Sequence, residues 1–162
     1  MYKTVYLGLG SNSIDKEVML KRARILVSAL LGEVVKVSNL YATDPWGYED
    51  QPIFINQVIE VQVSAEIEKI IDLTFFIEQQ LGKKKTSKLG PRNIDIDILL
   101  VDDLIYSWED VEIPHPRLHL RNFVLIPLAE IAPGLMIPDH NETVESLLNQ
   151  CTDKGKVTPL SE

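Results

Sequence analysis

The sequence is poor in cysteine, because Cys151 is the only one among its 162 residues. One cysteine cannot form an intrachain disulfide, and such sparse use is typical of proteins in a reducing compartment. No stretch joins a basic segment to an apolar run and a small-residue cleavage site. No apolar run is long enough to span a bilayer. We therefore expect a cytoplasmic protein with no membrane partner.

Positive charge is also scarce, since 16 Lys and Arg residues stand against 24 Asp and Glu residues, for a net charge of −8. The phosphate backbone of a nucleic acid selects a broad positive surface, so this balance counts against nonspecific nucleic-acid binding. Basic residues nevertheless gather between Lys83 and Arg92, where they suit a small polyanion. The length and the 45% hydrophobic fraction predict one domain over residues 1–162. We expect its polar tail, residues 152–162, to be loosely held.

What the sequence does contain is an acidic strand at 93–100, Asn-Ile-Asp-Ile-Asp-Ile-Leu-Leu. Strand alternation places Ile94, Ile96 and Ile98 on one face, and Asp95 and Asp97 on the other. The two aspartates are then about 6.7 Å apart along the strand, and at an effective dielectric near 20 they repel each other by about 2.5 kcal/mol. Mg²⁺ would relieve this repulsion, and so would the basic residues upstream. A solvated outer face of the strand is the structural alternative.

Hydrophobic periodicity predicts the element order β-α-β-β-α-β. The expected strands cover residues 4–9, 34–40, 54–63 and 93–100. The first helix should bury a stripe that includes Leu30 and end at Gly32, and the second should have Ser64 as its N-cap. This order predicts an α+β fold, with a ferredoxin-like split βαβ antiparallel sheet, helices on one face and a C-terminal extension. The extension is expected to hold a turn and short strand in 102–108, and helices in 121–131 and 143–149.

An aromatic and amide cluster follows the second predicted strand. Residues 43–48, Thr-Asp-Pro-Trp-Gly-Tyr, form an expected loop, and Phe54 and Asn56 lie two apart on the next strand. An aromatic wall beside an amide suits a planar heterocycle, which can stack on the ring and pair with the amide. The alternative is a structural loop, anchored by Trp46 over a core phenylalanine.

Two shorter motifs also leave two interpretations open. Residues 8–12, Gly-Leu-Gly-Ser-Asn, begin like a dinucleotide fingerprint, but Ser13 stands where the third glycine belongs. We interpret them as a tight turn after the first strand, whose backbone N–H groups a ligand can approach. His115 lies between Pro114 and Pro116, which restrict the backbone around it. This histidine either contacts a ligand or has a structural role.

Together these motifs closely resemble the 6-hydroxymethyl-7,8-dihydropterin pyrophosphokinase family of the folate pathway. The matching segments are Gly-Leu-Gly-Ser-Asn, Tyr-Ala-Thr-Asp-Pro-Trp, Gln-Pro-Ile-Phe-Ile-Asn, Gly-Pro-Arg-Asn-Ile-Asp-Ile-Asp-Ile-Leu-Leu, Ile-Pro-His-Pro-Arg and Arg-Asn-Phe-Val-Leu-Ile-Pro-Leu. The resemblance runs in order through residues 4–138. It implies that ATP donates its β,γ-diphosphoryl group to the pterin hydroxymethyl oxygen and releases AMP. It also implies two Mg²⁺ ions, bridged by Asp95 and Asp97.

The resemblance further implies a role for each matching residue. The catalytic residues would be Arg92, Asp95, Asp97 and His115. The pterin would contact Thr43, Asp44, Trp46, Phe54, Asn56 and Phe123, with the amide reading its edge and the two phenylalanines enclosing the ring. ATP would contact Glu78, Lys83, Lys85, Arg92, Ile98, His115 and Arg121.

The chain departs from the family pattern in several places. Lys83 and Lys85 stand where arginines are common, Leu89 where tryptophan is common, and Phe75 where a glutamine is expected. Because lysine cannot make the arginine fork, we expect a weaker grip on phosphate.

Two other functions fit parts of the same sequence. A metal-dependent phosphodiesterase or nuclease would use the same aspartates, but it leaves the aromatic loop without a role. An RNA-binding module would suit a split βαβ fold, but it conflicts with the acidic net charge. We expect small-molecule partners, ATP and a pterin, and a monomer.

Overall fold

The computed structural model describes residues 1–44, 52–82 and 94–160. These residues form an antiparallel sheet with the strand order β10-β3-β4-β1-β5, and β2 also pairs with β4. The elements that build its first part are β1 (Lys3–Ser11), α1 (Lys16–Leu30), β2 (Glu33–Val37), β3 (Tyr41–Thr43), β4 (Phe54–Val63), α2 (Ile67–Gln80) and β5 (Asp95–Val101). The central strand β1 lies between β4 and β5, which confirms the ferredoxin-like split βαβ arrangement.

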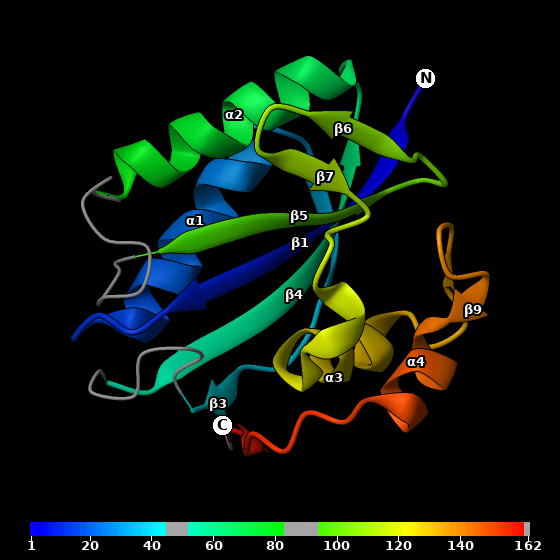
Figure 1. Cartoon of the computed structure of the whole chain (residues 1–162). Helices are drawn as coiled ribbons and strands as arrows, with labels where there is room; N and C mark the ends of the chain where they lie inside the picture. Colours follow the sequence, from blue (N-terminus) through cyan, green and yellow to red (C-terminus); the bar gives the residue numbers. More distant parts are fainter. Residues whose placement is uncertain (45–51, 83–93, 161–162) are drawn as a thin grey trace.

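The second part of the chain adds short elements around this sheet. They are β6 (Tyr106–Trp108), β7 (Val111–Ile113), a 3₁₀ turn (Leu118–Leu120), α3 (Asn122–Ile131), β8 (Met136–Ile137), β9 (Glu142–Thr143), α4 (Val144–Gln150) and β10 (Val157–Pro159). Strands β6 and β7 form a hairpin beside the free edge of β5 (Figure 1). In the described ranges, no helix has both the length and the apolar character that crossing a membrane requires.

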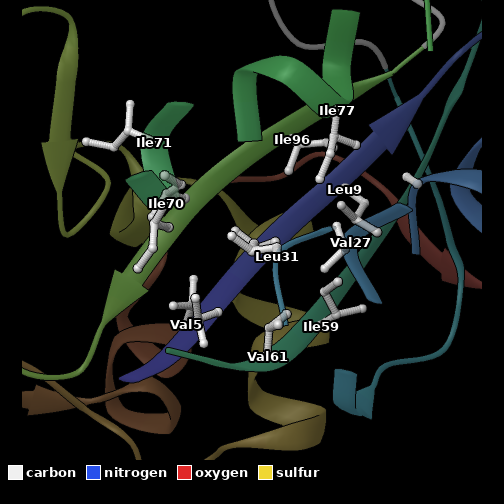
Figure 2. Close-up of a cluster of buried hydrophobic side chains, with 14 of the residues drawn as sticks. Val5, Leu9, Val27, Leu31, Ile59, Val61, Ile70, Ile71, Ile77 and Ile96 are labelled. Carbon is white, nitrogen blue, oxygen red and sulfur yellow. The ribbon is translucent and has the colours of Figure 1, made fainter. Parts of the chain in front are cut away.

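The main core lies between the sheet and the helices α1 and α2. Figure 2 shows Val5 and Leu9 of β1 and Ile59 of β4 facing Val27 of α1 and Ile70 of α2. Burial of these branched side chains stabilises the fold by about 25 cal/mol per Å² of apolar surface. The expected stripe of α1 was wrong at its end. Leu30 is 42% exposed, because the helix turns its last residue toward solvent.

Helices also cover the other face of the sheet, which corrects the prediction that they pack on one face. Figure 1 shows α3 and α4 on this face. Leu125 of α3 and Val144 of α4 form a second core there with Tyr6 of β1 and Val58 of β4. The central strands therefore carry apolar side chains on both faces, and a second helical layer is needed to bury them. Near the N-terminal end of β5, this second face instead carries polar residues and glycines.

Strand β5 contains a β-bulge that changes which side chains face each core. Tyr6 pairs with Leu100 and Leu7 pairs with Ile98, so Leu99 is the extra residue. Ile94, Ile96 and Ile98 face the main core, whereas Leu99 and Leu100 both belong to the second core. The predicted alternation is confirmed up to Ile98 and ends at the bulge.

Two local predictions were wrong. Ser64 does not cap α2, whose N-cap is Glu66 in an extended conformation with no side-chain hydrogen bond. The C-terminal tail is not loose throughout. Residues 157–159 form β10, which pairs with β3, and the Leu160 N–H donates to the Leu40 carbonyl at 2.9 Å. The free edge of β3 supplies backbone partners that a polar sequence does not reveal.

Candidate active site

The polar side chains of the second face lie in a row across three strands. Asn56 of β4 pairs with Gly10 of β1, and Gly10 pairs in turn with Asp95 of β5. Two residues away along both strands, Gly8 pairs with Asp97. Directly paired residues share a face of the sheet, so the amide and both carboxylates face the same side. Between them lie two glycines, which leave room for the side chains of Asn56 and Leu99 on the neighbouring strands.

Gly10 is required by the amide beside it. A Cβ at Gly10 would come within 2.7 Å of Asn56 Oδ1 and 3.9 Å of Phe54 Cδ1. The Asn56 amide is held in place, because its Nδ2 donates to Thr43 Oγ1 at 2.5 Å in a buried bond. Gly10 and Ser11 therefore belong to β1, which we predicted to end at Leu9, and not to a tight turn after it. Gly8 and Gly10 make room for neighbouring side chains on the sheet.

A cavity of about 220 Å³ lies along the outer edge of β5, between α2 and the β6–β7 hairpin. Its lining includes Phe75 and Glu78 of α2, the β5 residues 96–98, and His115. The Glu78 side chain is buried, and its Oε2 accepts a hydrogen bond from the Ile96 N–H at 2.9 Å. A carboxylate on α2 thus holds the edge of the strand between the two aspartates.

His115 is fixed by two backbone hydrogen bonds. Its N–H donates to the carbonyl of Leu99, the bulge residue, at 2.9 Å. Its Nδ1 accepts the Arg117 N–H at 3.1 Å, which places the proton of a neutral imidazole on Nε2. Burial lowers the pKa of His115, and the charges of Arg121 and Arg117 lower it further, while Asp97 and Glu112 oppose them. At neutral pH His115 is therefore a neutral donor beside the cavity.

The N-terminus of α3 brings a cation and an aromatic ring together. The guanidinium carbon of Arg121 lies 5.5 Å from the centroid of the Phe123 ring, within the range of a cation–π interaction. Arg121 is the N-cap residue and Phe123 is in the first turn. The helix packs on the second face of the sheet, the same face on which the aspartates and Asn56 lie.

The structure therefore groups the predicted site residues unevenly. Thr43, Phe54, Asn56, Asp95 and Asp97 lie on one face of the sheet, and Glu78, Ile98 and His115 line the edge cavity. Asp44 is exposed at the end of β3. The predictions for Trp46, Lys83, Lys85, Leu89 and Arg92 fall outside the described residues. Among the residues that are described, no three His, Cys, Asp or Glu side chains form a metal-binding cluster.

A family model described as 7,8-dihydro-6-hydroxymethylpterin-pyrophosphokinase matches residues 6–133, most of the chain. The chain belongs to this family. The 2-amino-4-hydroxy-6-hydroxymethyldihydropteridine pyrophosphokinase of Bacillus subtilis is 42% identical over 132 residues, which are 81% of this chain and 79% of the relative. The enzyme of the same name from Aquifex aeolicus is 35% identical and covers 93% of this chain and 94% of its own length.

A solved structure of the same fold comes from a longer protein. The wild-type Plasmodium falciparum HPPK-DHPS with pteroate has a TM-score of 0.76 and 17% identity, and the match covers 93% of this chain and 44% of that one. At this identity the likeness shows the fold.

Three features of this candidate site were missed by sequence reasoning. They are the close approach of Asn56 to Gly10, the Leu99 bulge that holds His115, and the Glu78 bond to the edge of β5. The first was signalled by glycines at alternate positions inside an apolar run, which is unusual for a strand interior. The other two depend on contacts between segments distant in sequence, and no local signal precedes them.

Proposed function

We propose that this protein transfers the β,γ-diphosphoryl group of ATP to the hydroxymethyl oxygen of 6-hydroxymethyl-7,8-dihydropterin, in folate biosynthesis. Its family and the names of its relatives support this activity. The observation that carries the site assignment is the row of Asn56, Gly10 and Asp95 across β4, β1 and β5. In this row, an amide that can pair with the edge of a heterocycle lies beside carboxylates that can bind the cations of a nucleotide.

The pterin binds, on this proposal, beside Asn56 on the second face of the sheet. Asn56 pairs with the ring edge, because the bond from its Nδ2 to Thr43 fixes the direction of its amide. Phe54 lies beside this position, and Phe123 of α3 offers a second ring from the same side of the sheet. Two aromatic faces enclose a planar ring by stacking. Asp44 at the end of β3 and Trp46 complete the proposed pterin contacts.

The donor set at Asp95 and Asp97 fits Mg²⁺. Both carboxylates lie on one face of a strand and are only half-buried. Mg²⁺ is usually held by one or two carboxylates together with substrate phosphates and water, which is what this pair offers. When bound there, two Mg²⁺ ions would neutralise charge on the phosphate oxygens. The protein supplies a rigid strand for both ligands.

ATP binds, on this proposal, in the cavity at the edge of β5. The Ile96 N–H faces this edge, and strand periodicity turns the backbone of Ile98 to the same edge, where it can pair with the adenine. Glu78 acts by holding the strand in position. His115 donates from Nε2 to a phosphate oxygen, and Arg121 adds a positive charge. Lys83, Lys85 and Arg92 are proposed to contact the phosphates as well.

The residues position the substrates for an in-line transfer. The pterin hydroxyl oxygen bonds to the β-phosphorus, and the bond from that phosphorus to the α–β bridging oxygen breaks. AMP leaves with the bridging oxygen, and the hydroxyl proton is released to solvent. Such a reaction needs alignment and charge neutralisation more than a strong base, and His115 and Arg121 supply these on a rigid frame.

The direct test is to mix the purified protein with ATP, Mg²⁺ and 6-hydroxymethyl-7,8-dihydropterin and to separate the nucleotides. We expect AMP and the pterin diphosphate in equal amounts, and no AMP when the pterin is omitted. Formation of ADP, or phosphodiester hydrolysis without pterin dependence, would overturn the proposal in favour of a hydrolase.

Gly10→Ala is expected to raise the KM of the pterin by about tenfold. The new Cβ would meet Asn56 Oδ1 at 2.7 Å, so the amide must move away from the ring edge and lose its bond to Thr43. The KM of ATP should change by less than about twofold, because the nucleotide cavity does not include Gly10. Gly134→Ala is the control, since a Cβ there meets nothing within 4 Å. An unchanged pterin KM would contradict the proposed pterin position.

We also propose that the chain works as a single domain and a monomer in the cytoplasm, with no nucleic-acid or membrane partner. The single cysteine supports a reducing compartment, and the net charge of −8 supports small-molecule substrates over nucleic acid. Light scattering at several protein concentrations tests the monomer.

A further inference from the structure

The C-terminal segment, residues 152–160, connects two parts of the site that lie far apart in sequence. After α4 the chain passes along α3 and reaches β3, as the red trace in Figure 1 shows. There β10 pairs with β3, and Val157 lies opposite Thr43. The segment lies beyond the residues 6–133 that match the family model.

At α3, this segment supplies the cap that the helix does not make for itself. The N-cap residue Arg121 has no side-chain capping bond. Instead, Asp153 Oδ2 accepts the N–H of Asn122, the first helical residue, at 3.1 Å. A carboxylate at this position also interacts favourably with the positive end of the helix. The Asn122 side chain returns a bond, because its Nδ2 donates to the Gly155 carbonyl at 2.6 Å.

The second oxygen of the same carboxylate orders the segment itself. Asp153 Oδ1 accepts the Gly155 N–H at 2.9 Å, which closes a tight local turn. Immediately after this turn, the Lys156 N–H faces Asp44 Oδ2 at 3.4 Å, and residue 157 enters the sheet beside β3. The turn that this carboxylate holds against the first turn of α3 thus leads directly into the contacts with the end of β3.

We propose that Asp153 is a positioning residue for pterin binding. It holds the start of the segment that joins α3, which carries Phe123, to the end of β3, which carries Thr43 and Asp44, and through this segment it sets the spacing between them. The inference rests on the proposed function, because those residues are assigned to the pterin there. ATP depends less on this link. Arg121 is its one proposed contact beside Asn122, and its cavity is built from α2, β5 and the segment at His115.

The test compares Asp153→Ala, Asp153→Asn and the wild-type full chain by equilibrium binding. The probe is the fluorescence of 6-hydroxymethyl-7,8-dihydropterin, titrated with Mg²⁺ and a nonhydrolysable ATP analogue present. We expect Asp153→Ala to weaken pterin binding by about tenfold and to change the Kd of the ATP analogue by less than about threefold. Asp153→Asn keeps one acceptor oxygen, so its pterin Kd should lie between those of wild type and Asp153→Ala.

Lys154→Ala is the matched control, because Lys154 is exposed in the same turn, and it should bind like wild type. Equal weakening for the pterin and the ATP analogue, or no weakening for either, overturns the inference. If Asp153→Ala does not fold, Asp153→Asn is compared with Lys154→Ala instead. Equal pterin Kd values for these two variants then reject the inference. Wild type that binds the pterin but makes no AMP contradicts the proposed reaction alone. Wild type that does not bind the pterin contradicts both.

Discussion

Asp97→Ala is expected to lower turnover by about 10³-fold and to leave the fold intact. On the proposed function, Asp97 helps to hold the cation that neutralises the phosphates. Metal ions contribute several kcal/mol to such transition states, and about 4 kcal/mol corresponds to about 10³-fold in rate. The free energy of unfolding should change by less than about 1 kcal/mol, because the substitution removes one of two like charges on β5.

Steady-state kinetics with saturating ATP and Mg²⁺, together with thermal denaturation, measure both effects. Asp103→Ala is the matched control, because it makes the same chemical change at an exposed position in the turn after β5. This control should retain full turnover. A loss of more than about 3 kcal/mol of stability in Asp97→Ala would instead point to a structural role for the carboxylate.

Glu78→Ala is expected to lower the free energy of unfolding by about 2–3 kcal/mol. The Glu78 side chain is only 4% exposed, and its Oε2 accepts the buried Ile96 N–H at 2.9 Å. Removal of the acceptor leaves that N–H buried without it, and hydrogen bonds to charged groups contribute about 1.5–3 kcal/mol. Ile96 lies between the two aspartates, so the KM of ATP should rise as well.

Urea denaturation of Glu78→Ala and Glu78→Gln separates the hydrogen bond from the charge. Gln keeps an acceptor oxygen at the same place, so Glu78→Gln should lose less than half as much stability as Glu78→Ala. Asp72→Ala, an exposed carboxylate on the same helix, is the control and should be neutral. Equal stability of Glu78→Ala and the control would show that the bond to β5 does not hold the strand.

Features that depend on local periodicity were predictable from the sequence. The bounds of β4, Phe54–Val63, match the prediction, because the β-branched alternation begins and ends there. The prediction that Ile96 lies on the opposite face of β5 from Asp95 and Asp97 is also confirmed. Side chains alternate with a period of two in every strand, whatever its place in the sheet. These elements carry the acidic pair and the aromatic–amide pair, so this part of the candidate site could be predicted from the sequence.

Features that depend on a partner segment were not predictable in this way. Gly10 was interpreted as part of a turn, although it lies within β1, because the reason for the glycine is Asn56 on a different strand. The bulge at Leu99 and its bond to His115 also have no local signature. The tail was predicted to be loose because it is polar, yet backbone pairing with β3 needs no apolar side chains.

The sequence alone determined the split βαβ order and the family, because periodicity and short motifs follow one another in order along the chain. It also placed the two aspartates on one face of a strand, because that follows from spacing along a single segment. Only the tertiary structure decided that Asn56, Gly10 and Asp95 form one row, that Glu78 holds the edge of β5, and that Asp153 caps α3. Each of these is a contact between segments far apart in the chain. Such contacts arise when the sheet aligns its strands and the helices pack against it, and no periodicity of one segment encodes them.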